Sequence, residues 1–165
     1  MGDIPITFSL RYDSLTAVMF LVVTAISFCV HLYSCVYMYT DPFLSRFMSY
    51  LSMFTFFMLL LVSSANLLVL FLGWEGVGLC SYLLISFWYT RVQAAKAATK
   101  AFLINKVGDL FFLTGIVLTF MVFHSVDFAV ISALSPYLPS DTLEILCVFF
   151  LLGAVGKSAQ VGLHT

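Results

Sequence analysis

Charged residues are scarce in this sequence. Asp, Glu, Lys and Arg together make up 9% of its 165 residues, whereas 62% of the residues are hydrophobic. Soluble globular domains carry about 25% charged residues, so this composition is not that of an ordinary soluble domain. The shortage of charge therefore indicates a membrane protein, and the lipid bilayer is its first expected partner.

Three further absences narrow the class of protein. The formal net charge of -1 leaves no excess of basic residues, which argues against a nucleic-acid-binding protein. The apolar runs lack the alternating polarity of a transmembrane β-barrel, so α-helices are the expected spanning elements. The four cysteines have no CxxC spacing and lie in apolar runs, so we expect them to act as small hydrophobic residues and not as metal ligands.

Long uncharged runs predict an all-α fold, a polytopic transmembrane bundle of about five spans in a single domain, residues 1–165. Residues 47–90 contain one charged residue, Glu75. A single helix of that length would measure about 66 Å, about twice the thickness of the hydrocarbon core, so a turn is required. The polar residues 63–66 (Ser-Ser-Ala-Asn) favour a turn there. The predicted spans are residues 15–39, 47–64, 66–90, 94–123 and 143–165.

The predicted connections differ in charge on the two sides of the membrane. One side collects the basic residues Arg46, Arg91 and Lys96. The other side collects the acidic residues Asp127, Asp141 and Glu144, with only Arg11 to offset them. By the positive-inside rule, the basic side faces the matrix or cytoplasm, and the N-terminus is expected on the outer side.

Three ionisable residues fall near the middle of predicted spans: Glu75, Asp109 and Lys157. A charged side chain at the bilayer centre costs about 2.5–3.5 kcal/mol on insertion scales, so such residues pair or face water. Lys106 lies three residues before Asp109 on the same helix face, which permits a local ion pair. Glycines on both sides of Glu75 permit neighbouring helices to approach closely. We expect a functional site built from these charges.

Other interpretations fit the same polar residues. The intramembrane charges are also consistent with a structural ion network that fixes helix register. His31 is either a proton relay or a packed polar group within its span. Lys96 and Lys100 are expected to anchor their helix at the interface. Trp74, like most of the aromatic residues, is expected to serve packing.

Three segments carry a family resemblance. Residues 73–91 (GWEGVGLCSYLLISFWYTR), the following KAATKAFLINKVGD and the final GKSAQVGLHT closely resemble subunit 5 of NADH:ubiquinone oxidoreductase, respiratory complex I. Residues 31–38 resemble the third helix of that subunit. The amino-acid sequence of these segments is more similar to mitochondrial members of the family than to the related bacterial sodium/proton antiporter subunits. The resemblance implies a location in the mitochondrial inner membrane, with the bacterial inner membrane as the alternative.

The resemblance also implies a function. It predicts a proton-translocating, antiporter-like subunit of an enzyme complex that uses NADH, FMN, iron–sulfur clusters and ubiquinone, with no redox chemistry, cofactor or metal in this chain. Glu75 and Lys157 match the central pair of the family's first half-channel, and Asp109 matches a nearby acidic partner. Lys106 occupies a position at which the family usually has arginine. A lysine cannot form the bidentate contact with a carboxylate that an arginine forms.

The family has two further helices before the one that matches residues 15–39, and it continues beyond residue 165 into a second half. The resemblance therefore implies a fragment equivalent to helices three to seven, and it predicts a split subunit completed by a companion chain. Other membrane-arm subunits of complex I are the remaining expected partners. Two alternatives stay open, a scaffold in the membrane arm that no longer pumps and a subunit of a multisubunit sodium/proton antiporter.

Overall fold

The computed structural model describes residues 7–164, and the chain runs through them as a series of helices. Five of the helices in this described part are long: α1 (Ser14–Tyr37), α2 (Leu44–Val62), α3 (Leu67–Ile85), α4 (Val92–Phe123) and α6 (Ser140–Lys157). Between α4 and α6 lie the short helix α5 (Phe128–Leu134) and a single 3-10 turn (Ser135–Tyr137). The all-α fold class predicted from the sequence is confirmed.

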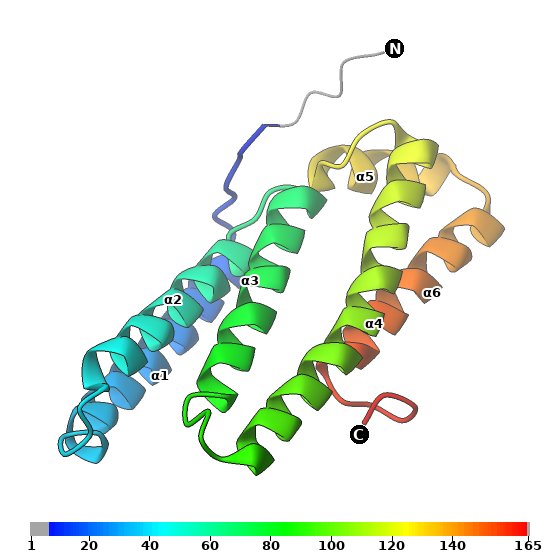
Figure 1. Ribbon diagram of the computed structural model, residues 1–165. Coiled ribbons are helices and arrows are strands. Elements are labelled where there is room, and N and C mark those ends of the chain that lie inside the picture. Colours follow the sequence, from blue (N-terminus) through cyan, green and yellow to red (C-terminus); the bar gives the residue numbers. More distant parts are fainter. Residues whose placement is uncertain (1–6, 165) are drawn as a thin grey trace.

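The long helices pack side by side in chain order. Helix α1 packs on α2, α2 on α3, α3 on α4 and α4 on α6, while α5 lies across one end of the row (Figure 1). A small core beneath α5 joins α3 and α4 to the loop between α4 and α5, and its buried members are Leu67, Phe112, Ile116 and Val126. The row therefore places α3, α4 and α6 in reach of one another.

Within residues 7–164, four helices are long and apolar enough to cross a membrane: α1, α2, α3 and α4. Helix α6 corresponds to the predicted span 143–165, but it begins three residues earlier and ends at Lys157. Its 18 residues include Asp141, Glu144 and Lys157, so its apolar stretch is shorter. The helix does not extend to residue 165, since Ala159, two residues after its end, adopts a φ of 51°, outside the right-handed helical region. Thr165 lies outside the described residues.

The turn predicted at residues 63–66 is confirmed. Helix α2 ends at Val62 and α3 begins at Leu67. The side chain of Asn66 accepts a hydrogen bond from the backbone N–H of Val69 at 2.8 Å and so caps α3. Its Nδ2 atom donates to the carbonyl oxygen of Thr7 at 2.8 Å. Asn66 therefore ties the N-terminal segment to the start of α3.

The connections lie at opposite ends of the row. Backbone bridges join Leu10 to Ser64 and Asn66 to Asp127, so the N-terminal segment, the α2–α3 turn and the α4–α5 loop meet at one end. At the other end, the indole N–H of Trp88 donates to the carboxylate of Asp41 at 3.3 Å and joins the α3–α4 connection to the α1–α2 connection. The helices thus run alternately up and down.

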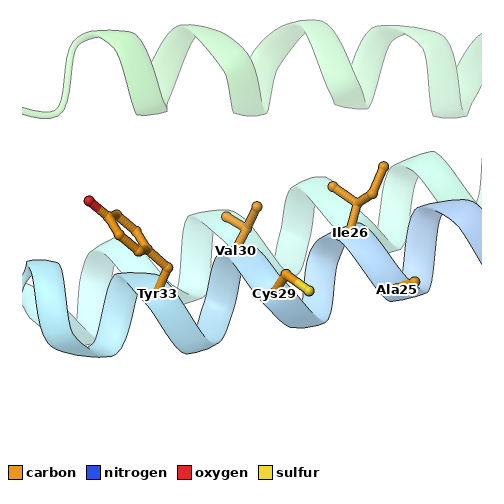
Figure 2. A pocket seen from close by; sticks show the side chains of 5 residues that line it. All are labelled: Ala25, Ile26, Cys29, Val30 and Tyr33. Atoms are coloured by element: carbon orange, nitrogen blue, oxygen red, sulfur yellow. The ribbon is translucent and has the colours of Figure 1, made fainter.

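The outward face of α1 is apolar. An open pocket with a volume of about 380 Å³ is lined by side chains of this helix alone. Figure 2 shows these side chains: Ala25, Ile26, Cys29, Val30 and Tyr33. Phe28, Leu32 and Val36 are also more than half exposed on α1. Apolar side chains that face outward are typical of a helix in contact with lipid or with another membrane helix.

Candidate proton-transfer site

Three helices bring together the four charged residues that the sequence singled out. Glu75 lies near the middle of α3, Lys106 and Asp109 lie in the middle of α4, and Lys157 is the last residue of α6. Contacts among these residues and Trp74 link all three helices. The structure therefore assembles one cluster from residues up to 82 positions apart in the sequence, between Glu75 and Lys157.

Lys106 connects the two carboxylates. Its ammonium group forms a salt bridge with Glu75 Oε2 on α3. It also lies 4.0 Å from Asp109 Oδ2 within α4, which is the local pair that the spacing of three residues predicted. The side chains of Lys106 and Glu75 are 43% and 31% exposed, whereas that of Asp109 is 6% exposed. The pair between Lys106 and Glu75 thus lies at the open side of the cluster.

Lys157 contacts Trp74, the residue before Glu75. Its ammonium group donates a hydrogen bond to the backbone carbonyl oxygen of Trp74 at 2.7 Å and lies 5.2 Å from the centre of the Trp74 ring. Among the described residues, Lys157 forms no salt bridge with a carboxylate. In this structure, therefore, the direct cationic partner of Glu75 is Lys106, and Lys157 belongs to the same cluster through Trp74.

Asp109 is buried and hydrogen-bonded. Only 4% of the residue is exposed. Its Oδ1 atom accepts a hydrogen bond from the indole N–H of Trp74 at 2.7 Å. Sequence reasoning assigned Trp74 to packing and missed this contact. The available signal was that a buried indole N–H usually needs an acceptor, and Trp74 directly precedes an intramembrane carboxylate.

Small residues set the spacing between the helices. A Cβ atom at Gly108 of α4 would lie 3.1 Å from the Cα of Gly156 in α6, so the two backbones nearly touch beside Asp109 and Lys157. A Cβ atom at Gly73 would lie 2.8 Å from the backbone of Leu61 in α2. The close approach expected near Glu75 is thus observed between α2 and α3.

His31 lies apart from the cluster. It is half-buried between α1 and α2, where its Nδ1 atom hydrogen-bonds the carbonyl oxygen of Ser27 at 2.7 Å and its Nε2 atom hydrogen-bonds Ser52 Oγ at 3.2 Å. Ser27 Oγ in turn hydrogen-bonds Thr55 Oγ1 at 2.8 Å. These groups form a polar bridge between α1 and α2. In the described part of the chain, no hydrogen bond joins this bridge to Glu75 or Lys157.

Comparison with known proteins identifies two family models along the chain. Residues 64–165 match the family described as NADH:quinone oxidoreductase/Mrp antiporter, TM. Residues 1–48 match the family described as NADH-Ubiquinone oxidoreductase (complex I), chain 5 N-terminus. The residues of the charged cluster all fall in the first of these matches. The two matches together cover most of the sequence.

Curated relatives bear the name NADH-ubiquinone oxidoreductase chain 5. The protein of that name from Metridium senile is 57% identical over 96% of this chain. Those from Dictyostelium discoideum and Arabidopsis thaliana are 51% and 55% identical over 99% and 93% of this chain. The chain spans about a quarter of the length of these relatives, between 24% and 26%.

A solved structure shares the fold. The structure of the Mrp complex from Dietzia sp. contains a chain that matches 92% of this chain with a TM-score of 0.76 and 21% sequence identity, over 17% of its own length. At this identity the similarity concerns the arrangement of the helices. Together, the family models, the relatives and the fold show that this chain belongs to the chain 5 family of NADH-ubiquinone oxidoreductase, one of the antiporter-like membrane subunits.

Proposed function

We propose that this chain is part of a proton-translocating membrane-arm subunit of NADH:ubiquinone oxidoreductase. In this proposal, Glu75, Lys106, Asp109 and Lys157 form part of one half-channel. The observation that carries it is the meeting of two carboxylates and two amines where α3, α4 and α6 pack together, two of which, α3 and α4, are long and apolar enough to cross a membrane. Ionisable groups inside a membrane are costly, and they mark ion and proton pathways where they pair with one another.

The balance of charge makes the cluster sensitive to a single proton. The carboxylates of Glu75 and Asp109 offset the ammonium groups of Lys106 and Lys157. A proton that binds to Glu75 removes one negative charge and leaves an excess of positive charge beside Lys157, in surroundings where charges interact strongly. Release of a proton from Lys157 then restores the balance. Entry of one proton at Glu75 is thus coupled to the exit of another from Lys157.

The open side of the cluster points to a covering partner. Lys106 and Glu75 are partly exposed although they lie in membrane-spanning helices, and exposure of such groups to lipid is costly. In this proposal, protein or pathway water covers that side. The protein is supplied by other membrane-arm subunits and by the remaining sequence of the subunit, which includes a companion chain if the subunit is split.

The redox groups belong elsewhere in the complex under this proposal. NADH, FMN, the iron–sulfur clusters and ubiquinone are assigned to other subunits, and this chain contributes the proton pathway alone. The inner mitochondrial membrane is the proposed location. Support comes from the eukaryotic sources of its relatives, among them the sea anemone Metridium senile and the plant Arabidopsis thaliana.

A subunit of a multisubunit sodium/proton antiporter is the second candidate. The fold similarity to a chain of the Mrp complex favours it, because the same arrangement of helices serves in that assembly. The relatives with 51–57% identity favour complex I, since they are named as its chain 5. Purification of the assembly decides between the two candidates, because flavin and iron–sulfur subunits accompany this chain only in complex I.

The substitution Glu75→Gln tests the proposed function. It keeps the size of the side chain and removes the charge that pairs with Lys106. We expect the intact complex to assemble and to pump fewer protons per NADH oxidised, because the coupled release from Lys157 loses its trigger. Proton uptake is measured in sealed membrane vesicles, with assembly checked on the same sample.

Glu144→Gln is the matched control. Glu144 is an exposed residue in the second turn of α6, outside the cluster, so removal of its charge is expected to leave pumping unchanged. Normal pumping by a fully assembled Glu75→Gln complex would instead identify the chain as a scaffold of the membrane arm, and the proposed proton pathway would be wrong.

A further inference from the structure

Trp74 is the residue through which Asp109 and Lys157 meet. Its indole N–H donates to Asp109 Oδ1 at 2.7 Å, and its carbonyl oxygen accepts a hydrogen bond from Lys157 Nζ at the same distance. The ammonium group also lies 5.2 Å from the centre of the indole ring, within the range of a cation–π interaction. One residue of α3 therefore holds a carboxylate of α4 with its side chain and an amine of α6 with its backbone.

The indole ring is fixed in place by a stack of aromatic rings. Trp74 stacks on Phe112 with ring centres 5.0 Å apart and planes inclined by 13°. Phe112 is buried, and it also contacts the rings of Phe71 and Phe150, at 6.1 Å and 5.2 Å. Rotation of the indole away from Asp109 would break this packing. The N–H is thus held in the direction of the carboxylate.

Gly78 gives Lys157 access to α3. It lies four residues after Trp74, on the same side of the helix, and a Cβ atom there would lie 3.0 Å from Lys157 Nζ. At that distance the ammonium group must move by a few tenths of an ångström to admit a methyl group. The ammonium group therefore lies against three groups: the carbonyl oxygen of Trp74, the ring of Trp74 and the backbone of Gly78. We call this site the seat of the ammonium group.

The chemistry of this seat differs from that of a direct ion pair. A carboxylate in contact with Lys157 could accept its proton, whereas a peptide carbonyl or an aromatic ring attracts the cation but does not take up the proton. The indole N–H likewise donates a hydrogen bond without ionising. Trp74 therefore holds Asp109 and Lys157 close together while it keeps them as two separate proton sites.

We propose that Trp74 is a positioning residue of the proton pathway, which holds the Asp109 carboxylate and the Lys157 ammonium group at fixed places and keeps them from neutralising each other directly. This inference rests on the proposed function and deepens it. Trp74 carries no proton itself and acts through the two charged groups. The other charged groups of the cluster are Glu75 on α3 and Lys106 on α4.

The substitution Trp74→Phe, made in the intact complex, tests the inference. It removes the indole N–H and keeps an aromatic ring and the backbone carbonyl. We expect fewer protons pumped per NADH oxidised and a changed pH dependence of pumping, because Asp109 loses its donor. Adding Trp74→Phe to Asp109→Asn is expected to cause little further loss, since both changes act on the same contact.

Trp88→Phe is the matched control. Trp88 also donates its indole N–H to an aspartate, Asp41, but it does so at the end of the helix row, outside the cluster. Its substitution is expected to leave the pH dependence of pumping unchanged. An equal effect of both substitutions, or full additivity of Trp74→Phe with Asp109→Asn, would assign Trp74 to general packing and overturn the inference.

Gly78→Ala provides a second, independent test. It leaves the indole unchanged and shifts the ammonium group relative to the Trp74 carbonyl oxygen, so pumping is expected to fall while the complex assembles. If Trp74→Phe prevents assembly, this variant decides the matter, and normal pumping by Gly78→Ala would overturn the inference. A loss with Glu75→Gln but with neither Trp74→Phe nor Gly78→Ala would refute the positioning role alone. If none of the three variants Glu75→Gln, Trp74→Phe and Gly78→Ala pumps fewer protons, the proposed function is refuted.

Discussion

At the scale of single residues, Lys106 has the contacts that most clearly organise the site. It reaches Glu75 on another helix and Asp109 on its own, so one cation offsets two carboxylates. Removal of one member of such a set leaves an uncompensated charge, which is more damaging than loss of a pair at a protein surface. Lys106 is thus expected to influence the ionisation of both carboxyl groups, those of Glu75 and Asp109.

The pair Lys106→Arg and Lys106→Gln tests this role. A guanidinium group has several N–H donors and can contact both carboxylates, so the complex with Lys106→Arg is expected to pump normally. Lys106→Gln removes the charge and is expected to reduce pumping to about the level of Glu75→Gln, because both substitutions abolish the same ion pair. Proton uptake per NADH oxidised in sealed vesicles is the measurement. Equal pumping by both variants would show that the charge of Lys106 is dispensable.

At the scale of the helices, the contact between α4 and α6 brings Lys157 to the cluster. Gly108 and Gly156 allow the two backbones to touch, and Gly153 of α6 packs directly on Phe112, where a Cβ atom would lie 2.9 Å from the Phe112 Cβ. The crossing is thus determined by residues that lack side chains. Its position next to Asp109 means that a small change in helix separation moves Lys157 relative to Trp74.

Gly108→Ala tests the helix contact. The added methyl group would lie 3.1 Å from backbone atoms of α6, so the helices must separate slightly, at an expected cost of about 1–3 kcal/mol in stability. We expect a lower thermal stability of the assembled complex together with reduced pumping. Val107 directly precedes Gly108 in α4 and is exposed, so Val107→Ala is expected to change neither the thermal stability nor the pumping. Unaltered melting of the Gly108→Ala complex would contradict the close packing.

At the scale of the whole molecule, the alternation of the helices separates basic from acidic connections. Arg46 and Arg91 lie near the end where Trp88 contacts Asp41, whereas Asp127 and Asp141 lie near the end that carries α5 (Figure 1). The positive-inside rule then predicts that the basic end faces the matrix or cytoplasm. Under the proposed function, protons cross the membrane between this end and the end that carries α5.

Single-cysteine labelling tests this orientation. Tyr89 and Tyr137 are 67% and 85% exposed at opposite ends of the helix row. In a background without the native cysteines, Tyr89→Cys is expected to react with an impermeant maleimide from the matrix side, and Tyr137→Cys from the other side. The measurement compares intact mitochondria stripped of their outer membrane with inside-out vesicles. Reaction of both cysteines from one side would refute the alternating topology.

Sequence reasoning located the helices well because their signals are local. The long apolar runs of the chain lie in α1 to α4, and the polar residues 63–66 predicted the turn between α2 and α3. It was less accurate for α6, which ends at Lys157 and not at residue 165. Polarity in residues 158–164 indicates a weak span, but the positive φ of Ala159 depends on the backbone fold.

The sequence by itself determined that the chain is a helical membrane protein and that Glu75 and Asp109 fall within long apolar helices, since apolar length and the position of a charge are properties of the chain read in order. The predicted place of Lys157 in the middle of a span was wrong, because α6 ends at that residue. Only the tertiary structure decided which charges meet. Lys106 pairs with Glu75, and Lys157 rests on Trp74, because the rotation and spacing of α3, α4 and α6 bring those atoms together. Such contacts depend on how segments that are distant in the sequence pack together, and no local sequence pattern predicts that packing.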